Sequence, residues 1–168
     1  MNGPTSSTPP QRGIGTAIAL AMVDTSVLVQ AAVRDSGAKH RQANALLERL
    51  CAEDALAVSA QVLHEFYAAV TRPHGSRSTA HVQATQIIAA LVEAATVLPV
   101  TAAATVRALD AMTWHGLSYG DALVWATAKE GGVAVVHSEN FQDGRTVEGV
   151  RFANPFAESI REKCRASG

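Results

Sequence analysis

The stretch from Ala17 to Val29 places a single carboxylate, Asp24, at the end of an apolar run of strand length. Two hydroxyl side chains, those of Thr25 and Ser26, follow before the sequence becomes apolar again. Open α/β sheets bind ligands in the crevice beyond the carboxyl ends of their strands. Asp24 is therefore a candidate site residue, with the alternative that it only caps the helix that follows.

A second carboxylate, Glu65, lies in a helix predicted over residues 60–71. Apolar residues occur three positions before it and three and four positions after it, so Glu65 shares a largely apolar helix face. A buried acid needs a partner or a metal, because burial otherwise raises its pKa until it is neutral. The alternative is a residue at the edge of that face, leaning into solvent.

Asp121 repeats this pattern near the start of a helix predicted over residues 118–130. Ser118 and Asp121 match the Ser/Thr-x-x-Asp/Glu capping box, in which the acid satisfies backbone N–H groups at the helix start. A capping role and a site role are compatible. A carboxylate in the first turn of a helix is also well placed to reach a site beyond the strand ends.

The loop after the fourth predicted strand reads H-S-E-N-F-Q-D-G over residues 137–144 and contains Ser138, Glu139, Asn140 and Asp143. Four segments distant in sequence thus each offer an acid to the same region. The chain shows no nucleophilic cysteine, Ser-His-Asp order or glycine-rich phosphate loop. The carboxylates therefore indicate a hard divalent cation, Mg²⁺ or Mn²⁺, which activates water for phosphate ester hydrolysis.

Short β-branched runs alternate with longer amphipathic segments, and these elements must position the acids. Strands are predicted over residues 17–23, 55–59, 96–100 and 133–136, with a weak one over 150–152, and helices over 26–33, 38–52, 60–71, 78–94, 101–114 and 118–130. The alternation predicts a three-layer α/β/α sandwich with a mainly parallel sheet of four to five strands. Residues 1–16 are predicted to form a flexible leader and 157–168 a charged tail, around one domain over 17–156.

The composition is that of an ordinary globular domain, with 168 residues, 48% of them hydrophobic and 17% charged, and a net charge of -1. A net charge so close to zero excludes a global basic field, so a nucleic-acid partner requires a local patch and a metal. Arg72, His74, Arg77 and His81 are a candidate for such a patch. A solvated loop is the alternative reading of the same residues.

Cysteine usage and hydropathy bear on the compartment. The two cysteines form no disulfide framework and no zinc-ligand spacing, and the longest apolar run, residues 14–23, is too short for a membrane span. These features predict a cytoplasmic protein. A secretory signal cleaved near residues 19–21 is the alternative, but cleavage there would remove most of the strand that leads to Asp24.

Four segments together resemble the PIN-domain ribonucleases and, within that family, the VapC-type toxins of bacterial toxin–antitoxin modules. The matching segments are V-D-T-S-V-L-V (23–29), S-A-Q-V-L-H-E-F (59–66), Y-G-D-A-L-V-W-A-T-A (119–128), and H-S-E-N-F-Q-D-G (137–144) followed by V-E-G-V-R-F-A-N-P-F (147–156). They occur in the family's order and spacing.

The resemblance implies a Mg²⁺- or Mn²⁺-dependent endoribonuclease. It also implies a homodimer and a small antitoxin whose C-terminal segment lies in or near the catalytic groove. It assigns the metal and the catalysis to Asp24, Glu65 and Asp121. Help in orienting the metal, its water or another ligand falls to Thr25 or Ser26, and to Ser138.

Asn140 departs from the family pattern, because many relatives have an aspartate at this position. The fourth acid is then Glu139 or Asp143, or the site combines three carboxylates with the Asn140 amide. Two other functions fit parts of the sequence. A non-catalytic or weakly active PIN scaffold is consistent with Asn140. A haloacid-dehalogenase-like phosphatase would require a second aspartate two residues after Asp24, where Ser26 stands.

Overall fold

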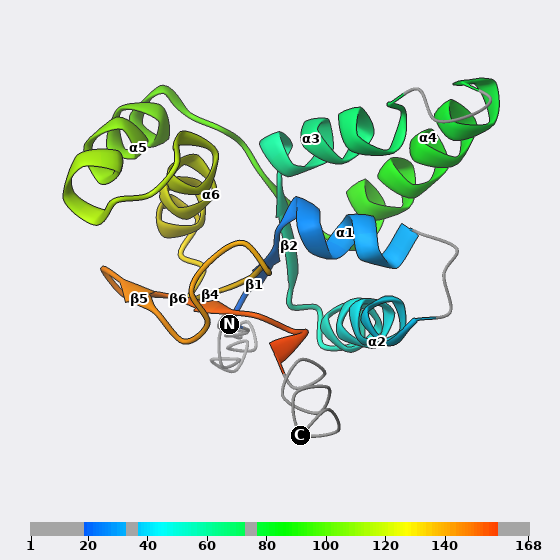
Figure 1. Ribbon diagram of the computed structural model, residues 1–168, viewed down its shortest axis with the longest axis horizontal. Helices are drawn as coiled ribbons and strands as arrows, with labels where there is room; N and C mark the ends of the chain where they lie inside the picture. The colour runs from blue at the N-terminus through cyan, green and yellow to red at the C-terminus, as the bar shows by residue number, and fades with distance from the viewer. Residues whose placement is uncertain (1–18, 33–36, 73–76, 158–168) are drawn as a thin grey trace, which may run out of the picture.

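The computed structural model describes residues 19–32, 37–72 and 77–157 (Figure 1). The predicted leader over residues 1–16, the first two residues of the predicted first strand and nearly all of the predicted tail lie outside these ranges. The same holds for His74 of the candidate basic patch and for the side chain of Arg77. The domain limits of 17 and 156 therefore remain a prediction.

The described residues form one six-stranded sheet in the order β3-β2-β1-β4-β6-β5. The parallel strands are β1 (Ala21–Val23), β2 (Leu56–Ser59), β3 (Thr96–Leu98), β4 (Val135–His137) and β6 (Val150–Ala153), and β5 (Thr146–Val147) is antiparallel to β6. The mainly parallel sheet flanked by helices confirms the predicted fold class.

Strand β5 is one strand more than the predicted four to five. It is two residues long, so it carries no alternating pattern by which a strand is recognised in a sequence. Glu148 and Gly149 connect it to β6 with φ values of 45° and 90°. Positive φ at both central residues is the geometry of a type I′ hairpin turn, which Asn-Gly or Asp-Gly usually marks and Glu-Gly does not.

The helices are α1 (Thr25–Ala32), α2 (Ala38–Ala52), α3 (Ala60–Val70), α4 (Arg77–Ala94), α5 (Ala102–His115) and α6 (Tyr119–Glu130). Each begins and ends within one residue of its predicted bounds. Ser59 and Thr101 cap α3 and α5 through side-chain oxygens that accept from the N–H of Val62 at 3.1 Å and of Ala104 at 2.9 Å. Gly116, with φ of 64°, ends α5 in the left-handed conformation.

Helices α1 and α2 lie on one side of the sheet, and α5 and α6 lie on the other (Figure 1). The core between these layers contains the fully buried side chains of Trp125, Phe66, Phe152, Phe156 and Met22. None of the helices in the described ranges is long and apolar enough to cross a membrane.

Parallel pairing brings the carboxyl ends of three strands to one edge of the sheet. Val23 of β1 pairs with His137 of β4, and β1 also pairs with β2 in parallel. The residues that follow these strands are Asp24, Ser138 and Ala60 at the start of α3. The sheet edge therefore collects the segments that carry most of the predicted site residues.

A candidate carboxylate site at the strand ends

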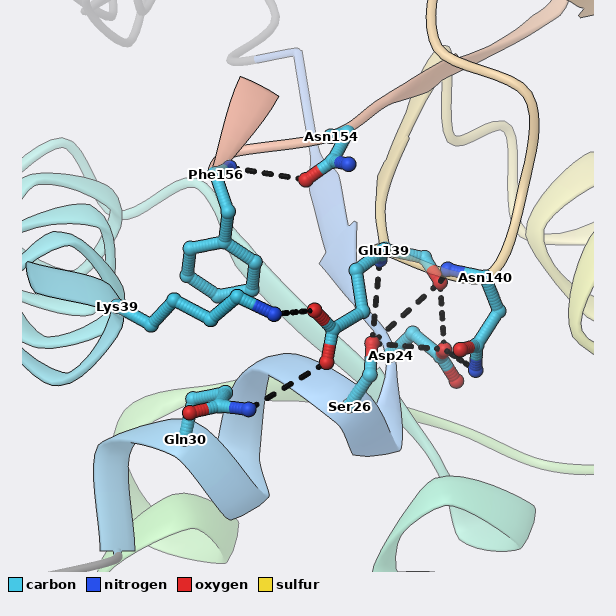
Figure 2. A network of polar contacts seen from close by, with 9 residues as sticks. Asp24, Ser26, Gln30, Lys39, Glu139, Asn140, Asn154 and Phe156 are labelled. Carbon is cyan, nitrogen blue, oxygen red and sulfur yellow. Dashed lines mark hydrogen bonds and ion pairs between the residues drawn. The ribbon is translucent and has the colours of Figure 1, made fainter. Parts of the chain in front are cut away.

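Asp24 follows β1 directly and is only 4% exposed. Its Oδ2 atom accepts hydrogen bonds from the Ser138 hydroxyl at 2.7 Å, the Ser26 hydroxyl at 3.2 Å and the Asn140 amide at 3.3 Å. Figure 2 shows Ser26 and Asn140 reaching this carboxylate from different segments of the chain. Donors from α1 and from the loop after β4 thus hold one oxygen of Asp24 in place.

The environment of Asp24 opposes its negative charge. Burial raises its pKa above the ordinary value, and the charge of Glu65 raises it further, whereas the Ser138 and Ser26 hydroxyls and the Thr25 backbone hold it down. The burial contribution is the largest of these. A cation at this place would stabilise the ionised form, because an opposite charge offsets the cost of burying a carboxylate.

Glu65 is exposed, so it takes the solvent-edge position that was the alternative for this residue. The buried residues of α3 are Val62, Leu63 and Phe66, so the face of the helix that packs on the core is not centred on Glu65. The carboxylate is nevertheless held in place. It accepts hydrogen bonds from the Thr25 hydroxyl at 2.9 Å and from Nε2 of Gln61 at 2.8 Å. Because Thr25 directly follows Asp24 in the chain, this hydrogen bond connects Glu65 to the segment that carries Asp24.

Asp121 is half-buried at the start of α6. The Ser118 hydroxyl donates to its Oδ2 at 2.7 Å and accepts from its backbone N–H at 3.3 Å. Capping by Ser118 is therefore observed. The Asp121 side chain bonds to the Ser118 hydroxyl, where the full capping box would have it accept from a backbone N–H.

Gln61 connects the two helices that carry Glu65 and Asp121. Its Nε2 atom donates both to Glu65 and to the carbonyl oxygen of Gly120, the latter at 3.1 Å. Sequence reasoning missed this residue. Its position four residues before Glu65 was the available signal, because side chains four apart on a helix can bond to each other.

Glu139 belongs to the same loop, but its carboxylate points away from Asp24 (Figure 2). Its backbone N–H donates to the Ser26 hydroxyl at 3.3 Å, while its side chain forms an ion pair with Lys39 and accepts from Gln30 at 3.4 Å. The Lys39 ammonium also lies 5.4 Å from the centroid of the Phe156 ring. Lys39 was not among the predicted site residues, since nothing in its local sequence indicates a partner 100 residues away.

Asp143 lies outside this network. Its Oδ1 atom accepts from the backbone N–H of Asn154 at 2.9 Å. The residue lines a separate cavity together with Arg49 and Arg151. The structure thus brings Asp24, Ser26, Ser138 and Asn140 into direct contact, joins Glu65 to them through Thr25, and places Asp143 elsewhere.

The carboxylate, hydroxyl and amide groups around Asp24 suit a hard cation, because such cations prefer oxygen ligands. In the parts of the chain that the structure describes, no three His, Cys, Asp or Glu side chains are arranged as a group that could hold a metal ion. A cation shared by Asp24, Glu65 and Asp121 would therefore require these side chains to move closer together. Asn140 presents its Nδ2 to Asp24. Rotation of this amide would be needed to offer its oxygen to a cation.

Comparisons with known proteins agree with this architecture. Residues 21–142 match the family model of the PIN domain. VapC20 from Mycobacterium tuberculosis, described as a sarcin-ricin loop cleaving toxin, is a similar structure with 27% identity and a TM-score of 0.54, covering 69% of this chain and 86% of that one.

Two further structures share the fold at lower identity. One is a toxin–antitoxin complex from Klebsiella pneumoniae, with 20% identity, a TM-score of 0.58, and coverage of 80% of this chain and 97% of that one. The other is VapBC2 from Rickettsia felis bound to a promoter DNA fragment, with 16% identity, a TM-score of 0.60, and coverage of 80% and 98%. No curated protein sequence matches this chain.

Proposed function

This chain belongs to the PIN-domain family, and from that membership we propose that it is a metal-dependent endoribonuclease, the toxin of a toxin–antitoxin pair. The observation that carries the proposal is the buried carboxylate of Asp24, held by three donors at the end of β1. A carboxylate whose burial disfavours its ionised form, at the strand ends of an open α/β sheet, is typical of a functional site. The similarity to VapC20, a toxin that cleaves the sarcin-ricin loop, supports RNA as the substrate.

We assign the cation, Mg²⁺ or Mn²⁺, to Asp24, Glu65 and Asp121. When bound, such a cation activates water and stabilises the charge that develops on a phosphodiester during hydrolysis. Ser138 and Ser26 orient the Asp24 carboxylate, and Thr25 and Gln61 orient that of Glu65. Exclusion of water from Asp24 strengthens its attraction for a cation.

The fourth position is best filled by the amide of Asn140. It contacts the Asp24 carboxylate directly, whereas Glu139 is engaged by Lys39 and Asp143 by the backbone of Asn154. The site then has three carboxylates and one amide. Under this assignment, the other two candidates for the fourth position, Glu139 and Asp143, lie outside the cation site.

The partners follow from the same comparison. We propose a small antitoxin protein as a partner, because structures of toxin–antitoxin complexes share this fold. We also propose a homodimer, a cytoplasmic location and a nuclease domain over residues 17–156. A haloacid-dehalogenase-like phosphatase finds no support in the family match.

RNA cleavage with and without Mg²⁺ or Mn²⁺ tests the activity, using wild type, Asp24→Ala and Asp121→Asn. Asp110→Asn is the matched control, because Asp110 is exposed on α5. Cleavage should require the cation, should be lost in both site variants and should persist in the control. Equal cleavage by all four proteins would overturn the assignment. Calorimetric titration with Mn²⁺ separates a nuclease from an inert scaffold, which would show no binding that depends on Asp24.

A further inference from the structure

A cavity of about 600 Å³ lies between α2 and the last parallel strand, apart from the carboxylate site. Polar and charged side chains share its lining with apolar ones, and they include Gln42 and Arg49 of α2, His137 of β4, Asp143 and Arg151 of β6. The proposed nuclease chemistry uses none of them. We refer to this cavity as the α2–β6 cleft.

Secondary structure directs these side chains to one place. Val135 pairs with Arg151 and His137 pairs with Ala153, and alternate residues of a strand share a face, so His137 and Arg151 lie on the same face of the sheet. On α2, Gln42 and Arg49 are seven residues apart, which places them two turns apart on one helix face. The cleft therefore collects two guanidinium groups from elements far apart in the sequence.

Asp143 brings one carboxylate into the cleft beside the two guanidinium groups, so the charged side chains of its lining carry a net positive charge. Burial, together with the charges of Arg49 and Arg151 that lie near the ring, lowers the pKa of His137 to about 4. The carboxylate of Glu53 lies 3.4 Å from Arg49, but both side chains are more than half exposed, so the attraction is small. Within the described ranges, no acidic side chain lies at ion-pair distance from Arg151.

Two polar atoms of the cleft residues are buried without a hydrogen-bond partner. They are Oε1 of Gln42 and Nδ1 of His137. An unsatisfied buried polar atom destabilises the folded state, and native proteins leave few of them. The Gln42 amide can present an N–H instead of its oxygen, and neutral histidine can carry its proton on Nδ1. Both residues line the cleft, but because both atoms are buried, a side-chain rotation must expose them before they can donate to an anion beside the two arginines.

The cleft adjoins the carboxylate site across the end of β4. The carbonyl oxygen of His137 accepts from the backbone N–H of Asp24 at 2.9 Å, and the next residue, Ser138, bonds to the Asp24 side chain. Lys39 precedes Gln42 by three residues on α2 and lies beside Glu139 of the site loop. Helix α2 thus carries one cationic side chain beside the site loop, Lys39, and another in the cleft, Arg49.

We propose that the α2–β6 cleft binds a backbone phosphate of the RNA chain, outside the carboxylate site. The inference rests on the proposed function, because RNA is the anion that a ribonuclease must hold. Guanidinium groups match phosphate with paired hydrogen bonds, and neutral donors from Gln42 and His137 complete the coordination. The cleft positions the strand and takes no part in bond cleavage.

Binding of a fluorescent single-stranded oligoribonucleotide tests the inference, measured by anisotropy in EDTA over a series of salt concentrations. Each phosphate contact on a single strand contributes about 0.7 to the slope of log K against log salt. Arg151→Gln and Arg49→Gln should each reduce the slope by about that amount. Arg107→Gln, on the exposed side of α5, should leave it unchanged. Slopes in both cleft variants equal to that of Arg107→Gln would overturn the inference.

A second measurement keeps the test informative if one variant is unstable. The imidazole signals of His137, followed by NMR, should shift when RNA is added to the wild-type protein. A shift with inorganic phosphate or a glutamate-rich peptide, but none with RNA, would overturn the inference in favour of a free anion or an acidic protein partner. Cleavage with Mg²⁺ is scored separately. If the protein cleaves RNA but the cleft variants leave the slope unchanged, only the proposed phosphate site is refuted. If the cleft variants reduce the slope but the protein does not cleave RNA, only the proposed nuclease function is refuted.

Discussion

The hydroxyl of Ser138 donates to the carboxylate of Asp24 over 2.7 Å, across 114 residues of sequence. The contact exists because β1 and β4 are parallel neighbours whose ends coincide in register, Val23 beside His137. Ser138 is itself almost fully buried, at 1% exposure. It also accepts from the backbone N–H of Asn140 at 3.0 Å, so one hydroxyl holds both the buried acid and the loop beside it.

Ser138→Ala should lower the free energy of unfolding by about 1 kcal/mol, the usual value of one buried hydrogen bond. It should also raise the pKa of Asp24, because this hydroxyl lowers it in the wild type. The acidic limb of the pH profile for RNA cleavage should therefore move to higher pH. Thr113→Ala, on the exposed face of α5, serves as control. An unchanged acidic limb would show that Ser138 does not orient Asp24.

Asp24→Asn should abolish cleavage while stabilising the metal-free protein near neutral pH. Burial raises the pKa of Asp24 in the folded chain above its ordinary value of 3.8. The folded state then binds the proton more tightly, so its stability falls as pH rises through the interval between the two pKa values. Asparagine does not ionise, so the Asp24→Asn protein does not lose stability in this pH interval. Thermal melting in EDTA measures it, since 1 kcal/mol corresponds to roughly 2–4 °C for a chain of this size. Melting temperatures that differ equally at pH 3 and pH 7 would contradict the explanation.

Gln61→Ala should reduce cleavage by about 10- to 100-fold, the usual effect of removing a group that orients a metal ligand. The variant loses the bonds to Glu65 and to the Gly120 carbonyl, and thereby the connection between α3 and α6. Cation affinity, measured by calorimetry, should fall with the rate. Gln86→Ala, exposed on α4, should match wild type. Loss of activity with full cation affinity would assign Gln61 to another step.

The ion pair between Lys39 and Glu139 should contribute modestly to stability. The two side chains are 41% and 24% exposed, and pairs of this exposure contribute about 0.2–1 kcal/mol in double-mutant cycles. Lys39→Met, Glu139→Gln and the double variant supply the cycle, by urea unfolding at low and high salt. Arg49 and Glu53, both more than half exposed, give the reference pair. A coupling above that range, unaffected by salt, would show a stronger role for Lys39.

His137 should remain neutral down to about pH 4, where its pKa lies because of burial and the charges of Arg49 and Arg151. The unfolded chain binds this proton near pH 6.5, so the stability owed to a neutral His137 is full above that value. It is lost as pH falls towards 4, by up to about 3 kcal/mol. His137→Gln should remove this loss, whereas exposed His64→Gln should not. NMR titration of the ring gives the pKa directly, and a value near 6.5 would refute the assignment.

Local patterns predicted the helices well. Each helix in the described ranges starts and ends within one residue of its expected bounds, because apolar spacing and caps such as Ser59 and Gly116 act over a few residues. The hairpin strand β5 escaped prediction, since its turn is Glu-Gly and its two residues show no period. The prediction of an apolar face around Glu65 relied on the alanines at 68 and 69, and both are exposed. Short side chains such as alanine do not determine which side of a helix packs.

The fold class and the family can be predicted from the amino-acid sequence, because both depend on the order of local elements and on four short motifs. The sequence also predicted that Asp24 and the loop over residues 137–144 lie at the same end of the sheet, since parallel strands end at one edge. Three pairings become visible only in the folded chain: Asn140 contacts Asp24, Glu139 pairs with Lys39, and Asp143 lines the α2–β6 cleft with its two arginines. These pairings depend on strand register and on helix rotation, which are set by packing over the whole domain and leave no mark on neighbouring residues.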